Sequence, residues 1–264
     1  MFDTTSNAKS IENFVVLKIQ AVICRNYRPD YSTNMNTQLK ETIERIACAI
    51  DHTALKPQTT HSDIEILCNE AIKHGFASVC VNPSFVSLAA RHLAGSCTAT
   101  GTVIGFPLGA TLPDVKIYEA IQCMAAGATE LDLAANIPLL KSGDSRATDE
   151  IAAICKIAHS EGVLVKVIIE TSLLNESEKI YACEAVARSG ADFIKTSTGF
   201  SGGGATVEDI LLLRKHSPVK VRVKASGGIR DAKFAIALLD AGAERLGTSA
   251  GVAIMQSLLS EIDE

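Results

Sequence analysis

The stretch that decides the fold is Ile50-Asp51-His52-Thr53-Ala54-Leu55-Lys56-Pro57. It follows the first β-rich run of a chain in which eight such runs alternate with helical stretches. This alternation packs either as a closed (β/α)8 barrel or as an open, doubly wound sheet. An open sheet that binds a dinucleotide carries G-x-G-x-x-G after its first strand, and this stretch contains no glycine. The 264 residues also match a barrel's typical length of roughly 250, so the sequence predicts a (β/α)8 TIM barrel.

The apolar pattern places the elements of this barrel. Strands are predicted at Ala47–Ile50, Ser78–Val81, Gly101–Phe106, Glu130–Ala135, Leu164–Glu170, Phe193–Thr196, Val221–Lys224 and Arg245–Thr248. Helices, marked by apolar residues at i, i+3, i+4 and i+7, include Ser62–His74, Pro113–Ala126, Asp144–Ser160, Glu176–Arg188 and Asp231–Ala241. Ser62 with Glu65 has the spacing of a capping box, and Thr206 precedes a further helix. Glycines mark helix ends at Gly75, Gly127, Gly162, Gly190 and Gly242.

Composition excludes several classes of protein. With 47% hydrophobic residues the chain can build a large core, so a disordered chain is excluded. The net charge of -5 offers no basic surface for nucleic acid, and no apolar run approaches the roughly 18 residues of a membrane span. The eight cysteines form no C-x-x-C pair and do not cluster with histidine at zinc spacing. We therefore expect a cytoplasmic protein with no metal site and no nucleic-acid or membrane partner.

Residues 1–34 differ in composition from the rest of the chain. They mix Ser, Thr and Asn with a short apolar run, and the helical pattern begins just after Met35. We expect them to form an N-terminal extension that is a candidate for poor order, with a weak transit peptide as the alternative. Residues 35–264 are expected to form the barrel as one domain.

Two lysines near the ends of neighbouring strands need an explanation. A buried lysine is unfavourable unless it is paired, so Lys195 and Lys224 could each neutralise a carboxylate such as Asp132 or Glu170. Alternatively, Lys195 is a nucleophile that forms a Schiff base, which requires its pKa to fall from about 10.4 to near 7. Burial beside the ammonium of Lys224 would lower that pKa, and Asp132 would keep Lys224 charged and relay protons. Lys166 is interpreted as an ion-pair residue lower in the barrel.

Glycine-rich turns follow each of the last three predicted strands, at 199–204, 227–228 and 247–251. Backbone amides at helix N-termini bind anions, and glycine permits a close approach. Barrels commonly bind phosphate between the loops that follow strands 7 and 8. We therefore predict a phosphate site in these turns. Its candidate residues are Gly199, Gly227, Gly228 and Ser249.

Six motifs of this chain resemble the deoxyribose-phosphate aldolase family of class I aldolases. The most specific is Phe193-Ile194-Lys195-Thr196-Ser197-Thr198-Gly199, which resembles the family's Schiff-base strand. The others are Ile50-Asp51-His52-Thr53, Ser78-Val79-Cys80-Val81-Asn82-Pro83, Thr102-Val103-Ile104-Gly105-Phe106-Pro107-Leu108-Gly109, Lys166-Val167-Ile168-Ile169-Glu170-Thr171 and Lys224-Ala225-Ser226-Gly227-Gly228-Ile229-Arg230. The match runs in order from about residue 40 to about residue 255.

The resemblance implies reversible cleavage of 2-deoxy-D-ribose 5-phosphate to D-glyceraldehyde 3-phosphate and acetaldehyde, in deoxyribose phosphate catabolism. It implies Lys195 as the Schiff-base lysine, Lys224 as the lysine that perturbs it and Asp132 as the proton-relay aspartate. It also implies that Asp51 and Thr53 line the substrate pocket. No metal or organic cofactor is expected. The phosphosugar is the expected partner, and we expect a homo-oligomer, a dimer or a tetramer.

Three features depart from the family pattern. Ala250 follows Ser249 where many members have a second serine, which removes one hydroxyl from the phosphate site. Arg222 stands where a small residue is usual, and by strand parity it would point the same way as Lys224, to pair with a carboxylate or to change the pocket's charge. Residues 134–138 replace bulkier residues and a glycine, which leaves the wall at the fourth strand looser.

Two other functions are compatible with parts of this pattern. One is a different Schiff-base barrel, similar to transaldolase or fructose-bisphosphate aldolase. The other is a phosphosugar-binding protein that has kept the pocket and lost the chemistry. Release of acetaldehyde from deoxyribose phosphate separates both from the expected activity.

Overall fold

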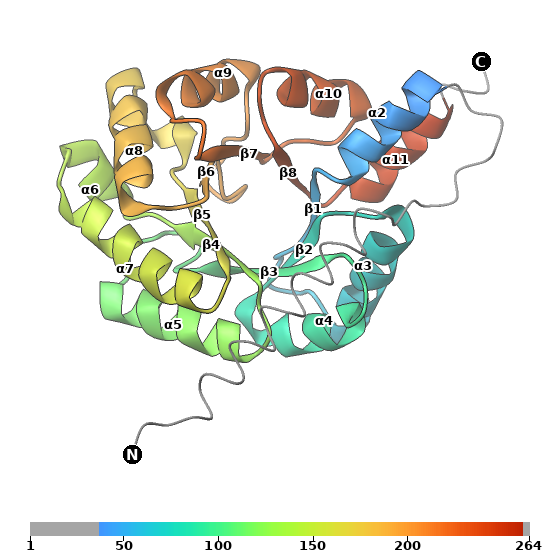
Figure 1. The fold of residues 1–264 in the computed structure, drawn as a ribbon, viewed down its shortest axis with the longest axis horizontal. Coiled ribbons are helices and arrows are strands. Elements are labelled where there is room, and N and C mark those ends of the chain that lie inside the picture. The colour runs from blue at the N-terminus through green and yellow to red at the C-terminus, as the bar shows by residue number, and fades with distance from the viewer. Residues whose placement is uncertain (1–36, 261–264) are drawn as a thin grey trace.

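The computed structural model describes residues 37–260, in which eight parallel strands close into a barrel with helices around the outside (Figure 1). Each strand pairs with the next along the chain, and β8 pairs with β1. The (β/α)8 barrel predicted from the sequence is therefore confirmed. The strands are β1 (Ile50–Ala54), β2 (Ser78–Val81), β3 (Ala99–Ile104), β4 (Glu130–Ala134), β5 (Leu164–Ile168), β6 (Phe193–Lys195), β7 (Arg222–Ser226) and β8 (Arg245–Thr248).

The helices form the outer layer of the barrel (Figure 1). They are α2 (Thr37–Ala47), α3 (His61–His74), α4 (Val86–Leu93), α5 (Pro113–Ala125), α6 (Ile137–Ser142), α7 (Arg146–Ser160), α8 (Glu176–Ser189), α9 (Val207–His216), α10 (Ala232–Asp240) and α11 (Gly251–Ser260). Two 3-10 turns are η1 (Pro83–Phe85) and η2 (Thr171–Leu173). No helix in the part of the chain described here is long and apolar enough to span a membrane. The extension predicted for residues 1–34 lies outside the described residues.

The apolar core lies between the strands and the helices, whereas charged side chains lie along the barrel axis. On β4, Leu131 and Leu133 are buried in the large apolar cluster with helix side chains. Neighbouring side chains on a strand point to opposite faces, so Glu130 and Asp132 point toward the axis. Both carboxylates are buried there. The strand that builds the core thus also carries charge into the barrel centre.

Several element bounds differ from the predicted ones. The first strand was expected at Ala47–Ile50, but α2 continues through Ala47 and β1 runs from Ile50 to Ala54. The prediction was wrong because Asp51 and His52 are polar, and polar residues were interpreted as following the strand. β3 ends at Ile104 because Gly105 turns the backbone to a φ of 62°. β5 stops at Ile168, before the predicted end at Glu170.

The predicted helix caps are confirmed in part. The predicted capping box of Ser62 and Glu65 is wrong: Thr60 caps α3, and Asp63 completes the box by accepting from the Thr60 backbone N–H at 2.8 Å. The predicted cap at Thr206 is confirmed, since its hydroxyl accepts from the Asp209 N–H at 3.0 Å. The five predicted end glycines all have positive φ, which confirms them as helix-ending positions.

Candidate active site

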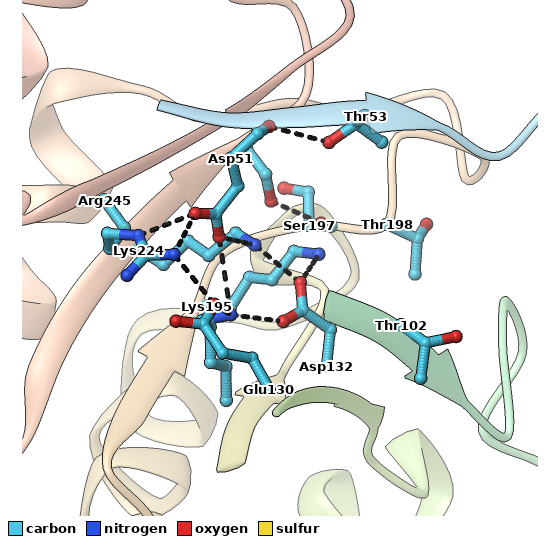
Figure 2. Close-up of polar contacts among 12 residues, drawn as sticks. Asp51, Thr53, Thr102, Glu130, Asp132, Lys195, Ser197, Thr198, Lys224 and Arg245 are labelled. Carbon is cyan, nitrogen blue, oxygen red and sulfur yellow. Dashed lines mark hydrogen bonds and ion pairs between the residues drawn. The ribbon is translucent and has the colours of Figure 1, made fainter. Parts of the chain in front are cut away.

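Lys195 and Lys224 meet at a single carboxylate oxygen in the barrel centre (Figure 2). Nζ of Lys195 donates to Oδ2 of Asp132 at 2.7 Å, and Nζ of Lys224 donates to the same oxygen at 2.6 Å. The register of the sheet explains the meeting, because Lys195 on β6 pairs directly with Lys224 on β7. Only 4% of Lys195 is exposed, and Lys224 and Asp132 are fully buried. The three residues expected to carry the chemistry are therefore in contact.

The surroundings drive the two amines to opposite protonation states. Burial, assisted by the charge of Lys224, lowers the pKa of Lys195 although Asp132 opposes the shift. Burial also disfavours the charged form of Lys224, but Asp132 and Asp51 outweigh it and raise the pKa of Lys224. For Asp132, burial opposes ionisation, yet the surrounding lysines hold its pKa well below the usual value. The arrangement favours a neutral Lys195 beside a charged Lys224.

Further charged side chains in the barrel centre contact Asp132 and Asp51, the carboxylates that bind the two lysines. Lys166 donates to Glu130 at 2.5 Å and to Oδ1 of Asp132 at 3.0 Å, which confirms it as an ion-pair residue. Arg245 donates through Nε to Asp51 at 2.6 Å and through Nη2 to Glu130 at 2.7 Å. Carboxylates thus alternate with cations across the barrel centre.

Charge counting within this cluster points to the same protonation state. Its three carboxylates belong to Asp51, Glu130 and Asp132. Its cations, apart from Lys195, belong to Lys166, Lys224 and Arg245. The cluster is therefore neutral when Lys195 is uncharged, and protonation of Lys195 would leave an uncompensated buried charge.

A pocket of about 840 Å³ opens beside Lys195 at the mouth of the barrel. Glycines of the β6 and β7 turns line it with positive φ: 84° at Gly199, 89° at Gly227 and 79° at Gly228. A Cβ on Gly227 would lie 2.9 Å from the Cα of Gly204, so only glycine fits there. Thr53 and Ser249 line the same pocket. The amine and the predicted phosphate turns thus share one cavity.

Asp51 occupies a different place from the pocket wall expected for it. It is fully buried, and its Oδ2 accepts from Nζ of Lys224, so it belongs to the charge cluster. Arg222 was expected to pair with a carboxylate or to change the charge of the pocket. Its guanidinium instead lies over the ring of Phe193, 3.9 Å from the centroid. This contact places its charge against an aromatic face.

Sequence reasoning missed several residues of the site. Arg245 and Glu130 begin β8 and β4, and no motif marks them. Strand parity was the available signal for Glu130, which lies two residues before Asp132 and so shares its face. Cys80 on β2 is buried with Leu55 and Val103, and burial raises the pKa of its thiol to about 11.

The chain is similar to known aldolases. The model of the DeoC/LacD family aldolases matches residues 45–257. Deoxyribose-phosphate aldolase 1 of Bacillus licheniformis is 53% identical over 221 residues, which are 83% of this chain and 99% of that protein. The deoxyribose-phosphate aldolase of Halalkalibacterium halodurans is 54% identical over 218 residues, 82% of this chain and 97% of that protein. The tetrameric deoxyribose phosphate aldolase structure from Aeropyrum pernix has a TM-score of 0.78 at 32% identity, covering 86% of this chain and 100% of that one.

Proposed function

The chain belongs to the DeoC/LacD family of aldolases, and from this we infer that it is a class I aldolase acting on deoxyribose phosphate. It cleaves 2-deoxy-D-ribose 5-phosphate reversibly to D-glyceraldehyde 3-phosphate and acetaldehyde through a lysine Schiff base. Lys195 is proposed as that lysine. The observation that carries the assignment is the pair of buried amines on one oxygen of Asp132, of which Lys195 has the lowered pKa.

In the cleavage direction, the neutral amine of Lys195 attacks the C1 aldehyde of the open-chain sugar. Loss of water gives an iminium, which is the electron sink for the next step. A base takes the proton of the C3 hydroxyl, the C2–C3 bond breaks, and its electron pair moves toward the iminium nitrogen. D-glyceraldehyde 3-phosphate leaves, and an enamine stays on Lys195. Protonation of the enamine at C2 and hydrolysis release acetaldehyde and the free lysine.

Asp132 and Lys224 are proposed to carry the protons of this cycle. Asp132 contacts both amines through Oδ2, so it lies where protons leave and return to the reacting atoms. Lys224 is held charged by Asp132 and Asp51 and can donate a proton to the enamine side of the site. General acid–base groups placed in this way typically contribute 10²–10⁴-fold to a rate.

The glycine turns are proposed to hold the substrate's phosphate. Gly199, Gly227 and Gly228 line the pocket, where their backbone amides are proposed to bind the phosphate, and Ser249 adds a hydroxyl two residues before α11 begins. Thr53 is proposed to line the substrate pocket, whereas Asp51 acts on Lys224. A bound phosphate would hold C1 of the sugar close to Lys195, so part of the binding free energy would lower the barrier to the reaction.

Borohydride trapping tests the assignment. We expect reduction in the presence of deoxyribose 5-phosphate to leave a two-carbon or sugar-derived adduct on Lys195, located by peptide mass spectrometry. A coupled assay for acetaldehyde should show turnover that Lys195→Met abolishes, while the matched variant Lys215→Met on the exposed face of α9 retains it. An adduct on another residue would contradict the assignment. Phosphosugar binding without acetaldehyde release would favour the non-catalytic alternative.

We further propose a homo-oligomer, a dimer or a tetramer, located in the cytoplasm. The Aeropyrum pernix relative is described as tetrameric, and closed symmetric assemblies are the usual state of such chains. Sedimentation of the purified full chain tests this. A monomer at micromolar concentration would contradict it.

A further inference from the structure

Lys116 is a fully buried lysine that comes from the helix layer and not from the strands. It lies on α5, and its Nζ donates to Oε1 of Glu150 on α7 at 2.6 Å and to the backbone oxygen of Ala134 at 2.9 Å. Ala134 is the last residue of β4, the strand that carries Asp132 into the barrel centre. One ammonium thus joins two helices to the end of that strand.

The peptide unit between Ala134 and Ala135 is held from both sides. Its N–H, which belongs to Ala135, donates to the oxygen of Ile168 on β5 at 3.0 Å, and its oxygen accepts from Lys116. The pairing of β4 with β3 ends at Leu133, so the oxygen of Ala134 lies beyond the last strand pair on that side. Lys116 therefore supplies a donor where the neighbouring strand no longer does.

The turn after β3 leaves room for the side chain of Lys116. Gly105 has a φ of 62°, and a Cβ on it would lie 2.8 Å from Cε of Lys116. Glu119, also on α5, accepts from the Gly105 N–H at 2.7 Å. Gly109 donates to the Gly105 oxygen at 2.8 Å, and a Cβ on Gly109 would overlap the backbone oxygen of Ala135. The turn and the end of β4 are therefore in close contact around the lysine.

Packing alone does not require a charge at this position. A buried ion pair such as Lys116 with Glu150 loses the hydration of both groups, and apolar side chains of similar volume often give equal or greater stability. Among the described residues, Oε2 of Glu150 is buried without a hydrogen-bond partner, which adds to the cost of the pair. An apolar side chain cannot supply the hydrogen bond from Lys116 to Ala134.

The end of β4 is connected directly to the reacting groups. Asp132 lies two residues before Ala134 on the same strand, and its Oδ2 accepts from Nζ of Lys195 at 2.7 Å. Ile168, which binds the same peptide unit as Lys116, is in register with Lys195. A displacement of about 1 Å in a reacting group can lower a rate about 100-fold, so a small shift of β4 would be felt at Asp132.

We propose that Lys116 is a positioning residue, which holds the end of β4 so that Asp132 stays in contact with the amine of Lys195. Glu150 orients the ammonium of Lys116 toward the strand. Lys116 does not line the substrate pocket, so it acts on the chemical steps and not on substrate binding. This inference rests on the proposed aldolase function.

The first test removes both charges and keeps the buried volume. Lys116→Met/Glu150→Leu leaves Ala134 without its donor. We expect its stability in urea to stay close to that of the wild type, kcat for deoxyribose 5-phosphate to fall about tenfold to 100-fold and KM to stay within about twofold. The matched control Arg188→Met/Glu184→Leu removes an exposed ion pair of α8 and should leave kcat unchanged.

Glu150→Gln separates the hydrogen bond from the ion pair. It removes the buried carboxylate and leaves Lys116 on the oxygen of Ala134, so stability should fall while kcat stays within about threefold of the wild type. If Lys116→Met/Glu150→Leu does not fold, Lys116→Met/Glu150→Gln is a second charge-free pair, for which the same loss of kcat is expected. A kcat that follows stability across these variants would overturn the proposal.

A double-mutant cycle with Asp132→Asn tests whether Lys116 acts through Asp132. In single-turnover measurements with excess enzyme, Lys116→Met/Glu150→Leu should lower the rate constant at least tenfold in the wild-type background. In the Asp132→Asn background it should change the rate constant less than about twofold, because the positioned carboxylate is already lost.

Equal losses in the two backgrounds, or wild-type kcat in a folded charge-free pair, would overturn the role proposed for Lys116. Failure of the wild-type chain to form a borohydride adduct on Lys195 would instead count against the aldolase function itself.

Discussion

Lys195 and Lys224 lie in nearly the same buried surroundings, yet their pKa values move in opposite directions. The difference comes from the carboxylates each amine contacts. Lys195 contacts Asp132, whereas Lys224 contacts Asp132 and Asp51. The contact with Asp51 thus favours the charged form of Lys224, whereas burial favours the neutral form of Lys195.

Lys224→Met should move the pH dependence of activity. Without Lys224, protonation of Lys195 would neutralise the cluster, so the pKa of Lys195 should rise. Activity requires the neutral amine, so the acidic limb of the kcat/KM profile should move to higher pH and activity at pH 7 should fall about 10²-fold or more. Lys215→Met, which changes an exposed lysine, should leave the limb in place. A limb that stays at the wild-type pH in Lys224→Met would refute the proposed role of Lys224.

Asp51→Asn should destabilise the fold more than an equivalent change at the surface. It leaves Lys224 and Arg245 short of a partner in a fully buried position, a loss of about 3–5 kcal/mol. Asp63→Asn, the matched change in the exposed cap of α3, should lower the stability far less, because solvent replaces the lost interaction. Urea denaturation at pH 7 measures both. Equal losses would show that Asp51 is not part of a tightly coupled cluster.

At the level of elements, the turns that follow β6, β7 and β8 carry the residues of the proposed phosphate site. Ser249→Ala removes a hydroxyl from the pocket and leaves the backbone amides. We expect kcat/KM for deoxyribose 5-phosphate to fall about fivefold to tenfold, the loss of one hydrogen bond of about 1 kcal/mol, and that for unphosphorylated deoxyribose to stay within twofold. An equal fall on both substrates would remove Ser249 from the phosphate site.

Gly227→Ala tests the close contact between the β6 and β7 turns. The new Cβ would lie 2.9 Å from Gly204 at a φ of 89°, so the turn must shift. We expect KM for deoxyribose 5-phosphate to rise about tenfold or more. Gly190→Ala at the end of α8 imposes a similar φ of 82° with open space around it, and should lower stability without changing KM. Matching KM values in the two variants would argue that the turn contact is unimportant for phosphate binding.

The strands show where sequence reasoning is strong and where it stops. β2 and β8 were predicted to the residue, because both are short runs bounded by clear turn signals. The predicted bounds of β1 were wrong because Asp51 and His52 are polar and both buried, Asp51 in the charge cluster and His52 beside Glu70 of α3, so the strand lacks the alternation of an ordinary strand. The largest error in the predicted strand bounds therefore fell on a strand that carries a buried charge.

At the scale of the whole molecule, the charge cluster is a product of barrel closure. Its members come from β1, β4, β5, β6, β7 and β8, and Lys224 and Asp51 are brought together through β8. Lys195 and Lys224 could be singled out because each lies in a local motif, and Asp132 because it is a charged residue in an otherwise apolar strand. Glu130, Arg245 and the contact of Lys116 with Ala134 could not, because they depend on distances between elements that no local pattern encodes.

The most direct test of this account is a pH titration of the Lys195 amine in the folded protein, by NMR of ¹³Cε-labelled lysine with Lys195→Arg used to assign the signal. We predict that Lys195 titrates clearly below the ordinary lysine value of about 10.4, and that the signal of Lys224 stays in the charged form beyond it. A Lys195 that titrates at or above the ordinary value would contradict the claim that the cluster keeps this amine uncharged.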